Sequence, residues 1–175
     1  MDFADYLSTN FQTIAKSPRP WKNTAESLKF AADLLHSKLI ELDTRVQLNE
    51  KGDLLSEAWS VSSIFMMLAG LSLENLIKGI LISQDPSIVN GGKFNWGRKP
   101  HGLVSLFKQA NVLVSSDEKM FLKRLEEFVA WVGRYPLPLA TTPLFNRQDR
   151  NVPIVGLPDD SNTFNNLYNR LITMF

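Results

Sequence analysis

Two oppositely charged residues lie inside a segment that is otherwise almost entirely apolar and that is predicted to be helical. Glu74 and Lys78 lie four positions apart inside the run 71–81, which holds no other charged residue. This separation places both side chains on one face of a helix, and charges inside an apolar run are costly unless they are paired. The pair therefore predicts either a polar binding site on the helical body or a structural ion pair whose lysine stem reaches toward solvent.

A histidine is the second candidate for chemistry. His101 follows Pro100 at the start of a predicted helix over residues 101–110. Histidine titrates near neutral pH, so His101 can serve as a general base. It can also cap backbone N–H groups or reach Glu74 on a neighbouring helix. We expect the structural role for His101, and a position on a helix surface for His36.

A loop interleaves basic and aromatic side chains between residues 93 and 99. Such side chains can contact phosphates and stack on bases, so Lys93, Trp96, Arg98 and Lys99 are candidates for a nucleic-acid contact. The same composition suits a contact with a partner protein. No phosphate-cradling glycine motif accompanies the loop.

Arg134 and Tyr135 lie between a predicted helix end and two nearby prolines. An arginine at a helix C-terminus is favoured by the helix dipole. Alternatively, Arg134 reaches a carboxylate such as Glu74, or a phosphate. We expect at least two of Lys78, His101 and Arg134 to lie within hydrogen-bonding reach of Glu74. The predicted polar cluster consists of Glu74, Lys78, His101, Arg134 and Tyr135.

The composition excludes several classes of site. The chain has 175 residues, enough for one domain with a sizeable core. It contains no cysteine, which excludes disulfides, a thiolate nucleophile and Cys-ligated metals. With only two histidines, we expect no metal site, and no motif indicates a cofactor. Residues 91–175 carry 11 Lys and Arg against 7 Asp and Glu, a weak indication of an anionic partner.

Targeting and membrane signals are not predicted. The first five residues include Asp2 and Asp5, whereas a signal peptide needs a basic start and an apolar centre. The longest charge-free apolar stretch of the first half, 58–73, is shorter than the about 20 residues of a spanning helix. We therefore expect a cytoplasmic protein and no membrane partner.

Apolar spacing predicts the helices of the first half. An amphipathic helix is expected over 2–15, followed by a break at the prolines of 17–20. A heptad-like seam then runs from a cap at Thr24 toward Gly52. A nearly all-apolar central helix is expected over 53–83.

The second half is predicted to be less regular. Residues 84–100 are expected to form a long loop without strands. A capping box at Ser115 and Glu118 predicts a helix running to about Gly133. Five prolines within 134–158 predict an irregular excursion before a last helix over 159–174, capped by Asp159 or Asp160.

These elements predict an all-α fold, an up-down bundle of four to six helices with a proline-rich excursion before the last one. We expect a single domain over 1–175, with its core over about 24–135 and the terminal helices as additions. The core residues expected to be mostly buried are Leu35, Leu39, Leu68, Leu71, Leu125 and Phe128.

Three strings in this order are similar to a known family: Ala69–Gly79 with its Glu-x-x-x-Lys, His101–Leu106 with its spaced leucines, and Gly133–Pro136. Over about residues 24–135, the chain resembles the HEPN superfamily of helical domains. The resemblance implies a bundle of four or five helices, a homodimer, and a role in a defence or toxin–antitoxin system. Many members are RNases.

The RNases of that family use an arginine followed a few residues later by a histidine. Neither histidine of this chain has an arginine at that spacing, and Arg98 is only three residues before His101. We therefore expect a non-catalytic HEPN-like domain that binds a ligand, a nucleotide or RNA, or a partner protein. The alternatives are an RNase with an atypical site using His101 and Arg134, and a purely structural interaction module.

Overall fold

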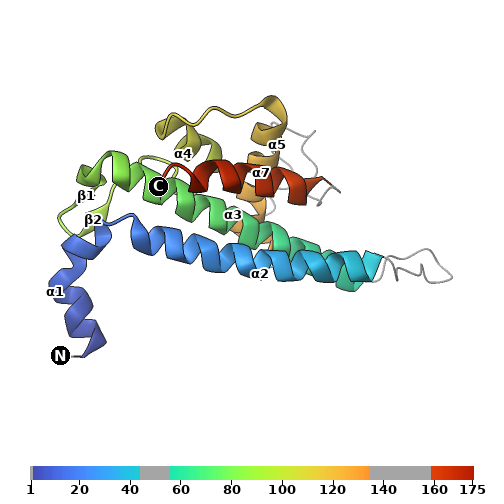
Figure 1. Cartoon of the computed structure of the whole chain (residues 1–175), viewed down its shortest axis with the longest axis horizontal. Helices are drawn as coiled ribbons and strands as arrows, with labels where there is room; N and C mark the ends of the chain where they lie inside the picture. The colour runs from blue at the N-terminus through green and yellow to red at the C-terminus, as the bar shows by residue number, and fades with distance from the viewer. Residues whose placement is uncertain (1, 44–55, 135–158) are drawn as a thin grey trace.

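The computed structural model describes residues 2–43, 56–134 and 159–175. Within them the protein is an all-α bundle, as predicted (Figure 1). The proline-rich excursion and the C-terminal end of the predicted heptad seam lie outside the described residues. The elements in chain order are α1 (Phe3–Ala15), α2 (Arg19–Asp43), α3 (Ser56–Gln84), the 3-10 helix η1 (Pro86–Ile88), β1 (Val89–Asn90), β2 (Lys93–Phe94), α4 (Leu103–Gln109), α5 (Ser116–Glu127), the π-helix η2 (Phe128–Val132) and α7 (Asp160–Ile172).

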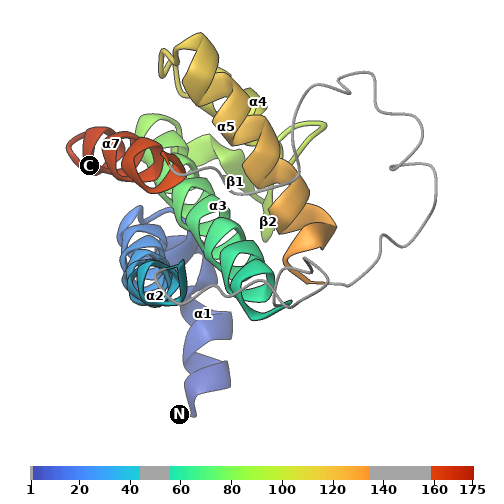
Figure 2. The same cartoon turned by 90° about the vertical axis from the view of Figure 1, so that its right-hand side faces the viewer.

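The central element is α3, which packs against α2, α4, α5, η2 and α7 (Figure 2). Its segment Val61–Gln84 is long and apolar enough to cross a membrane, but 72% of the window is buried inside the protein. This burial is typical of the core helix of a bundle, as predicted. The described segment 88–132 contributes to the same apolar core, and so does α7 through Phe164, Leu167 and Leu171.

The helix α2 lies along α3 and begins earlier than predicted. It starts at Arg19, with Pro20 in its first turn, rather than at Thr24. A proline is tolerated there because the N–H groups of the first turn have no helical partner. Ala25 and Ala32 are fully buried in the α2–α3 contact. The buried hydroxyl of Ser72 donates a hydrogen bond of 2.8 Å to the Ala25 carbonyl oxygen.

Two of the six residues predicted to form the core are buried, and the other four are partly buried. Leu125 and Phe128 are buried. Leu35, Leu39 and Leu68 pack against the core but are only partly buried. Leu71 is also intermediate. Of these four partly buried leucines, Leu35 and Leu39 belong to α2 and the other two to α3.

A small hairpin interrupts the predicted loop over 84–100. Val89 pairs with Phe94 and Asn90 with Lys93 in antiparallel register. Gly91 and Gly92, at φ of +56° and +73°, form the two-residue turn. Both positive values suit a turn that matches strand twist, and glycine adopts them without strain. The expectation of a loop without strands was wrong here.

Two positions where α3 packs against the α5–η2 segment have room only for glycine. A Cβ built on Gly70 of α3 would lie 2.6 Å from Val129 Cγ2, and one on Gly133 would lie 2.5 Å from Met67 Cβ. The predicted helix from Ser115 ends near Gly133 as expected, but its last turn is the π-helix η2. The predicted capping box of Ser115 and Glu118 is present at its start.

Candidate functional site

The candidate site is built around a buried carboxylate. Glu74 belongs to α3, and its side chain is 6% exposed. Its Oε1 contacts Lys78 Nζ at 2.6 Å and His101 Nδ1 at 2.9 Å. Two of the three predicted contacts to Glu74 are therefore present. The other oxygen, Oε2, is buried and receives no hydrogen bond from any described residue.

The Lys78 side chain is internal. Lys78 is 5% exposed, and its Nζ lies 5.1 Å from the centroid of the Trp96 ring, in a cation–π contact. The lysine stem therefore does not reach solvent as one of the two interpretations proposed. Glu74 and Lys78 have opposite charges, so together they form a neutral pair in the interior. The loop that carries Trp96 packs on this pair.

His101 is the exposed member of the cluster. Its side chain is 69% exposed, although its Nδ1 contacts the buried Glu74 carboxylate. The sequence placed His101 at a helix start, but α4 begins two residues later and has Gly102 as its cap residue. The imidazole therefore joins the loop to α3 by one edge of its ring, and most of the side chain remains accessible to solvent.

The start of α4 is held by a residue that the sequence pattern did not single out. The Glu126 carboxylate on α5 accepts a hydrogen bond of 2.9 Å from the Val104 backbone N–H. Burial raises the pKa of Glu126 above its ordinary value, although this hydrogen bond and nearby Lys99 oppose the shift. An acidic residue between the buried Leu125 and Phe128 was the available signal in the sequence.

The loop over 93–99 separates its two kinds of side chain. Lys93, Arg98 and Lys99 are exposed, whereas Trp96 is 8% exposed. The Trp96 ring stacks on Phe94 at 5.4 Å between centroids and meets Trp21 edge-on. Stacking of bases on Trp96 was one of the contacts that the composition of the loop allowed. The structure leaves no room for it, because the ring packs against Phe94, Trp21 and Lys78.

Arg134 is not part of the cluster. Its side chain is exposed at the end of η2, and no hydrogen bond or ion pair connects that side chain to a residue described here. The expected contact with Glu74 is absent because the neighbouring Gly133 packs on Met67, two helical turns before Glu74 along α3. Tyr135 lies outside the described residues.

His36 lies on α2, apart from the contacts of Glu74. It is partly exposed, as expected for a helix surface, and its ring centroid is 5.5 Å from that of Phe65. Among the residues that the structure describes, no group of three or more His, Asp or Glu side chains could hold a metal ion.

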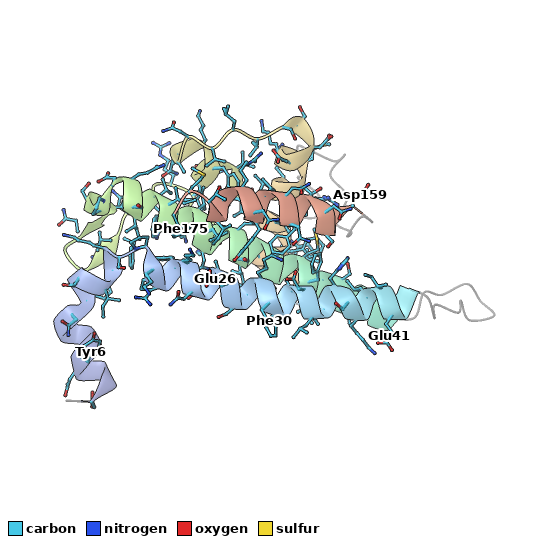
Figure 3. The ribbon with its side chains drawn as sticks, in the orientation of Figure 1. Tyr6, Glu26, Phe30, Glu41, Asp159 and Phe175 are labelled. Carbon is cyan, nitrogen blue, oxygen red and sulfur yellow. The ribbon has the colours of Figure 1, made fainter. Side chains whose placement is uncertain are left out.

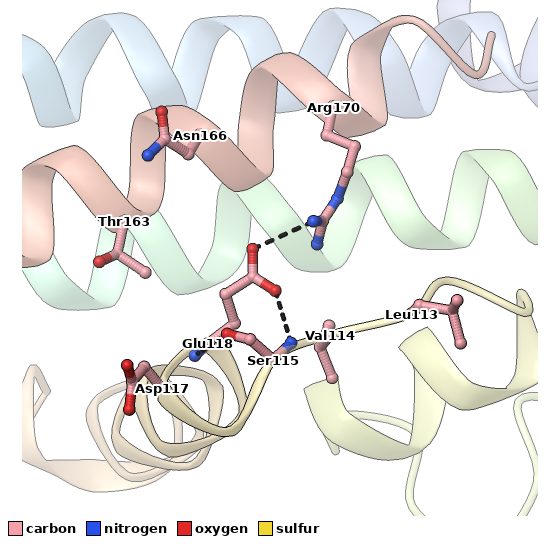
Figure 4. Close-up of a pocket in the computed structure, with 8 residues that line it drawn as sticks. All are labelled: Leu113, Val114, Ser115, Asp117, Glu118, Thr163, Asn166 and Arg170. Atoms are coloured by element: carbon pink, nitrogen blue, oxygen red, sulfur yellow. Dashed lines mark hydrogen bonds and ion pairs between the residues drawn. The ribbon is translucent and has the colours of Figure 1, made fainter.

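An open groove lies on another part of the surface, between α5 and α7. Its volume is about 580 Å³, and its walls include Leu113, Thr163 and Asn166. Arg170 Nη1 and Glu118 Oε1 form an ion pair of 3.1 Å across it (Figure 4). Glu118 also accepts a hydrogen bond from the Ser115 backbone N–H, so one carboxylate oxygen caps α5 and the other pairs with Arg170 of α7.

Comparisons with known proteins identify no relative. No family model matches the chain, and neither a curated protein nor a solved structure is significantly similar to it. The HEPN resemblance of the sequence stays a prediction.

Proposed function

We propose that the protein is a non-catalytic, HEPN-like binding domain that takes a phosphate-bearing ligand, RNA or a nucleotide, on the loop around His101. The observation that carries the proposal is the contact between exposed His101 and buried Glu74. A buried ion pair beneath an exposed imidazole is an expensive arrangement if it serves only to attach a loop. The HEPN resemblance adds a defence or toxin–antitoxin setting.

The exposed charges of the loop support an anionic ligand. Lys93, Arg98 and Lys99 all reach solvent, while the aromatic side chains between them turn inward. Lysine and arginine side chains provide most phosphate contacts in nucleic-acid complexes. Because Trp96 is internal, we expect contacts to the backbone phosphates rather than stacking on bases, and therefore little sequence preference.

The test is equilibrium binding of a labelled single-stranded RNA as the salt concentration is varied. Arg98→Ala with Lys99→Ala should weaken binding and lower the salt slope by about 0.7 for each phosphate that the variant no longer neutralises. The matched control is Lys108→Ala with Lys119→Ala, which removes the same charge from exposed positions elsewhere. Equal weakening in both double variants would show that only net charge matters and would refute the proposed site.

An RNase with an atypical site is the second candidate. The observation that favours it is the carboxylate behind His101, since such a partner orients the imidazole of a general base. The expected cationic partner, Arg134, makes no contact with this cluster within the described residues. We expect no cleavage of labelled single-stranded RNA. Cleavage that disappears in His101→Ala would establish the RNase instead.

An interaction module is the third candidate, and the outer face of α2 favours it. Phe30 and Leu34, one helical turn apart, are 66% and 58% exposed. Figure 3 shows Phe30 on the side of α2 that faces away from the bundle. Paired exposed apolar side chains are suited to a partner surface, including a second copy in the expected homodimer. Sedimentation equilibrium of the wild type and Phe30→Ser tests this, because a dimer through this face should dissociate in the variant.

A further inference from the structure

We infer that Glu74 fixes the tautomer of His101 and thereby makes phosphate binding at this site dependent on pH. The inference rests on the proposed function and concerns its regulation. In the tautomer that we infer, the neutral imidazole of His101 presents only a hydrogen-bond acceptor, Nε2, to the ligand. Protonation converts the same atom into a charged donor for a phosphate oxygen.

The tautomer follows from the donors and acceptors at the contact. A carboxylate offers only acceptor oxygens, so the hydrogen between Glu74 Oε1 and His101 Nδ1 must belong to the imidazole. Lys78 Nζ contacts the same oxygen at 2.6 Å, the geometry of an ammonium paired with a carboxylate. A neutral imidazole with its hydrogen on Nδ1 has a lone pair on Nε2.

The consequence for an anion follows from the exposure of the ring. Glu74 is buried and the His101 side chain is 69% exposed, so the edge opposite Nδ1 is the one a ligand can meet. A lone pair on Nε2 repels a phosphate oxygen, whereas a protonated imidazole donates a charge-assisted hydrogen bond to it. Histidine is the side chain whose charge changes most readily near neutral pH, so binding should strengthen as the pH falls.

Other charged groups surround the cluster and must be separated from His101 in any experiment. From α3 come Glu74 and Lys78, which are paired with each other. The loop contributes the exposed cations Arg98 and Lys99. From α5 comes Glu126, whose pKa is raised by burial. Glu126→Gln keeps the acceptor for Val104 and removes this second titration.

The tautomer can be read directly by NMR because the chain has only two histidines. Long-range ¹H–¹⁵N spectra at about pH 8 should show the hydrogen of His101 on Nδ1. Glu74→Leu with Lys78→Met removes the carboxylate and its partner together, which avoids an unpaired buried charge, and should move the hydrogen to Nε2. His36 is the internal control and should not change. A wild-type His101 with its hydrogen on Nε2 would overturn the inference.

The pH dependence is measured with a labelled oligouridylate, whose bases do not titrate in this range, at about pH 8 and about pH 5.5. Wild-type binding should tighten about tenfold at the lower pH, the effect of one charged hydrogen bond. His101→Gln should bind equally at both values, while His36→Gln and Glu126→Gln should keep the wild-type ratio. If His101→Gln still binds the RNA more tightly at about pH 5.5 than at about pH 8, the inference is overturned.

The two proposals fail in distinguishable ways. If no RNA or nucleotide binds at either pH, the proposed function is wrong. The inferred pH dependence of binding is then wrong too, whatever the NMR spectra show. If RNA binds through Arg98 and Lys99 but with no His101-dependent pH ratio, the proposed function stands and the inference is wrong.

Discussion

Arg124 on α5 and Asp160 on α7 form an ion pair that is buried on both sides. The two residues are 5% and 4% exposed, and Arg124 Nη1 donates to Asp160 Oδ2 at 3.0 Å while Nη2 donates to Oδ1. The two-pronged geometry is the strongest that an arginine and a carboxylate can adopt. The pair attaches the last described helix to the rest of the bundle.

Breaking this pair from one side should be strongly destabilising. Asp160→Ala leaves a buried guanidinium without its carboxylate, and we expect a decrease of about 3–5 kcal/mol in the free energy of unfolding. Arg124→Met with Asp160→Leu should be less destabilising, because the double variant removes both charges of the pair together. Chemical denaturation measures both, and an Asp160→Ala decrease below about 1 kcal/mol would contradict the buried pairing.

Gly70 should not tolerate even a methyl group. Alanine normally stabilises a helix by about 1 kcal/mol relative to glycine. At this position its Cβ would overlap Val129 Cγ2, so Gly70→Ala should instead cost about 1–3 kcal/mol. Val129→Ala removes the overlapping atom, and a double-mutant cycle should show a favourable coupling between the two substitutions. Strictly additive effects would exclude the overlap as the cause.

Two leucines of the core should differ in the cost of truncation. Leu73 is fully buried, so Leu73→Ala should cost about 2–5 kcal/mol. Leu39 is only partly buried at the rim of the α2–α3 contact, and Leu39→Ala should cost less. Thermal or denaturant unfolding of both variants checks the order. A larger cost at Leu39 would mean that its side chain is covered in solution.

The buried Glu126 carboxyl should make stability depend on pH. Because burial raises its pKa, the folded state binds this proton more tightly than the unfolded state does. The contribution of Glu126 to stability is therefore fully present below the ordinary glutamate pKa and declines as the pH rises through the raised value. The free energy of unfolding of the wild type, minus that of Glu126→Gln, should fall across this interval. A difference that is flat with pH would exclude the shift.

The same residue should also matter as a helix cap. Glu126→Ala removes the acceptor of the Val104 N–H and should cost about 0.5–2 kcal/mol, the range for removing a helix N-cap. Glu126→Gln retains an acceptor oxygen and is the control. Equal stabilities of the two variants would show that the hydrogen bond contributes nothing.

Periodicity made the bundle predictable, and spacing made one contact of the site predictable. Apolar residues at helical intervals gave α2, α3 and α5, and the four-residue separation of Glu74 and Lys78 required a common face. The contact of His101 with Glu74 was one of two structural roles considered for this histidine, beside capping of backbone N–H groups.

The remaining features depend on tertiary packing that one sequence does not encode locally. A cap at Asp159 or Asp160 was expected for the last helix. Asp159 occupies the N-cap position without a side-chain cap hydrogen bond, whereas Asp160 is the buried partner of Arg124. A capping aspartate and a buried ion-paired one look alike in sequence. Trp96 was a candidate for a nucleic-acid contact because it lies among basic residues, but the two-residue alternation of an extended segment turns its side chain inward. The strands β1 and β2 are two residues each, too short for alternation to be recognised.

The π-helix η2 means that the last turn of the α5 segment contains one residue more than an α-helical path would need. Ala130, exposed within it, can therefore be regarded as an insertion that the protein has absorbed without breaking the helix. Removing that residue should restore α-helical hydrogen bonding and keep Phe128 and Gly133 in place, whereas the same deletion earlier in α5 would rotate the buried face out of the core. We therefore expect the chain to tolerate a one-residue change in length within this π-helix.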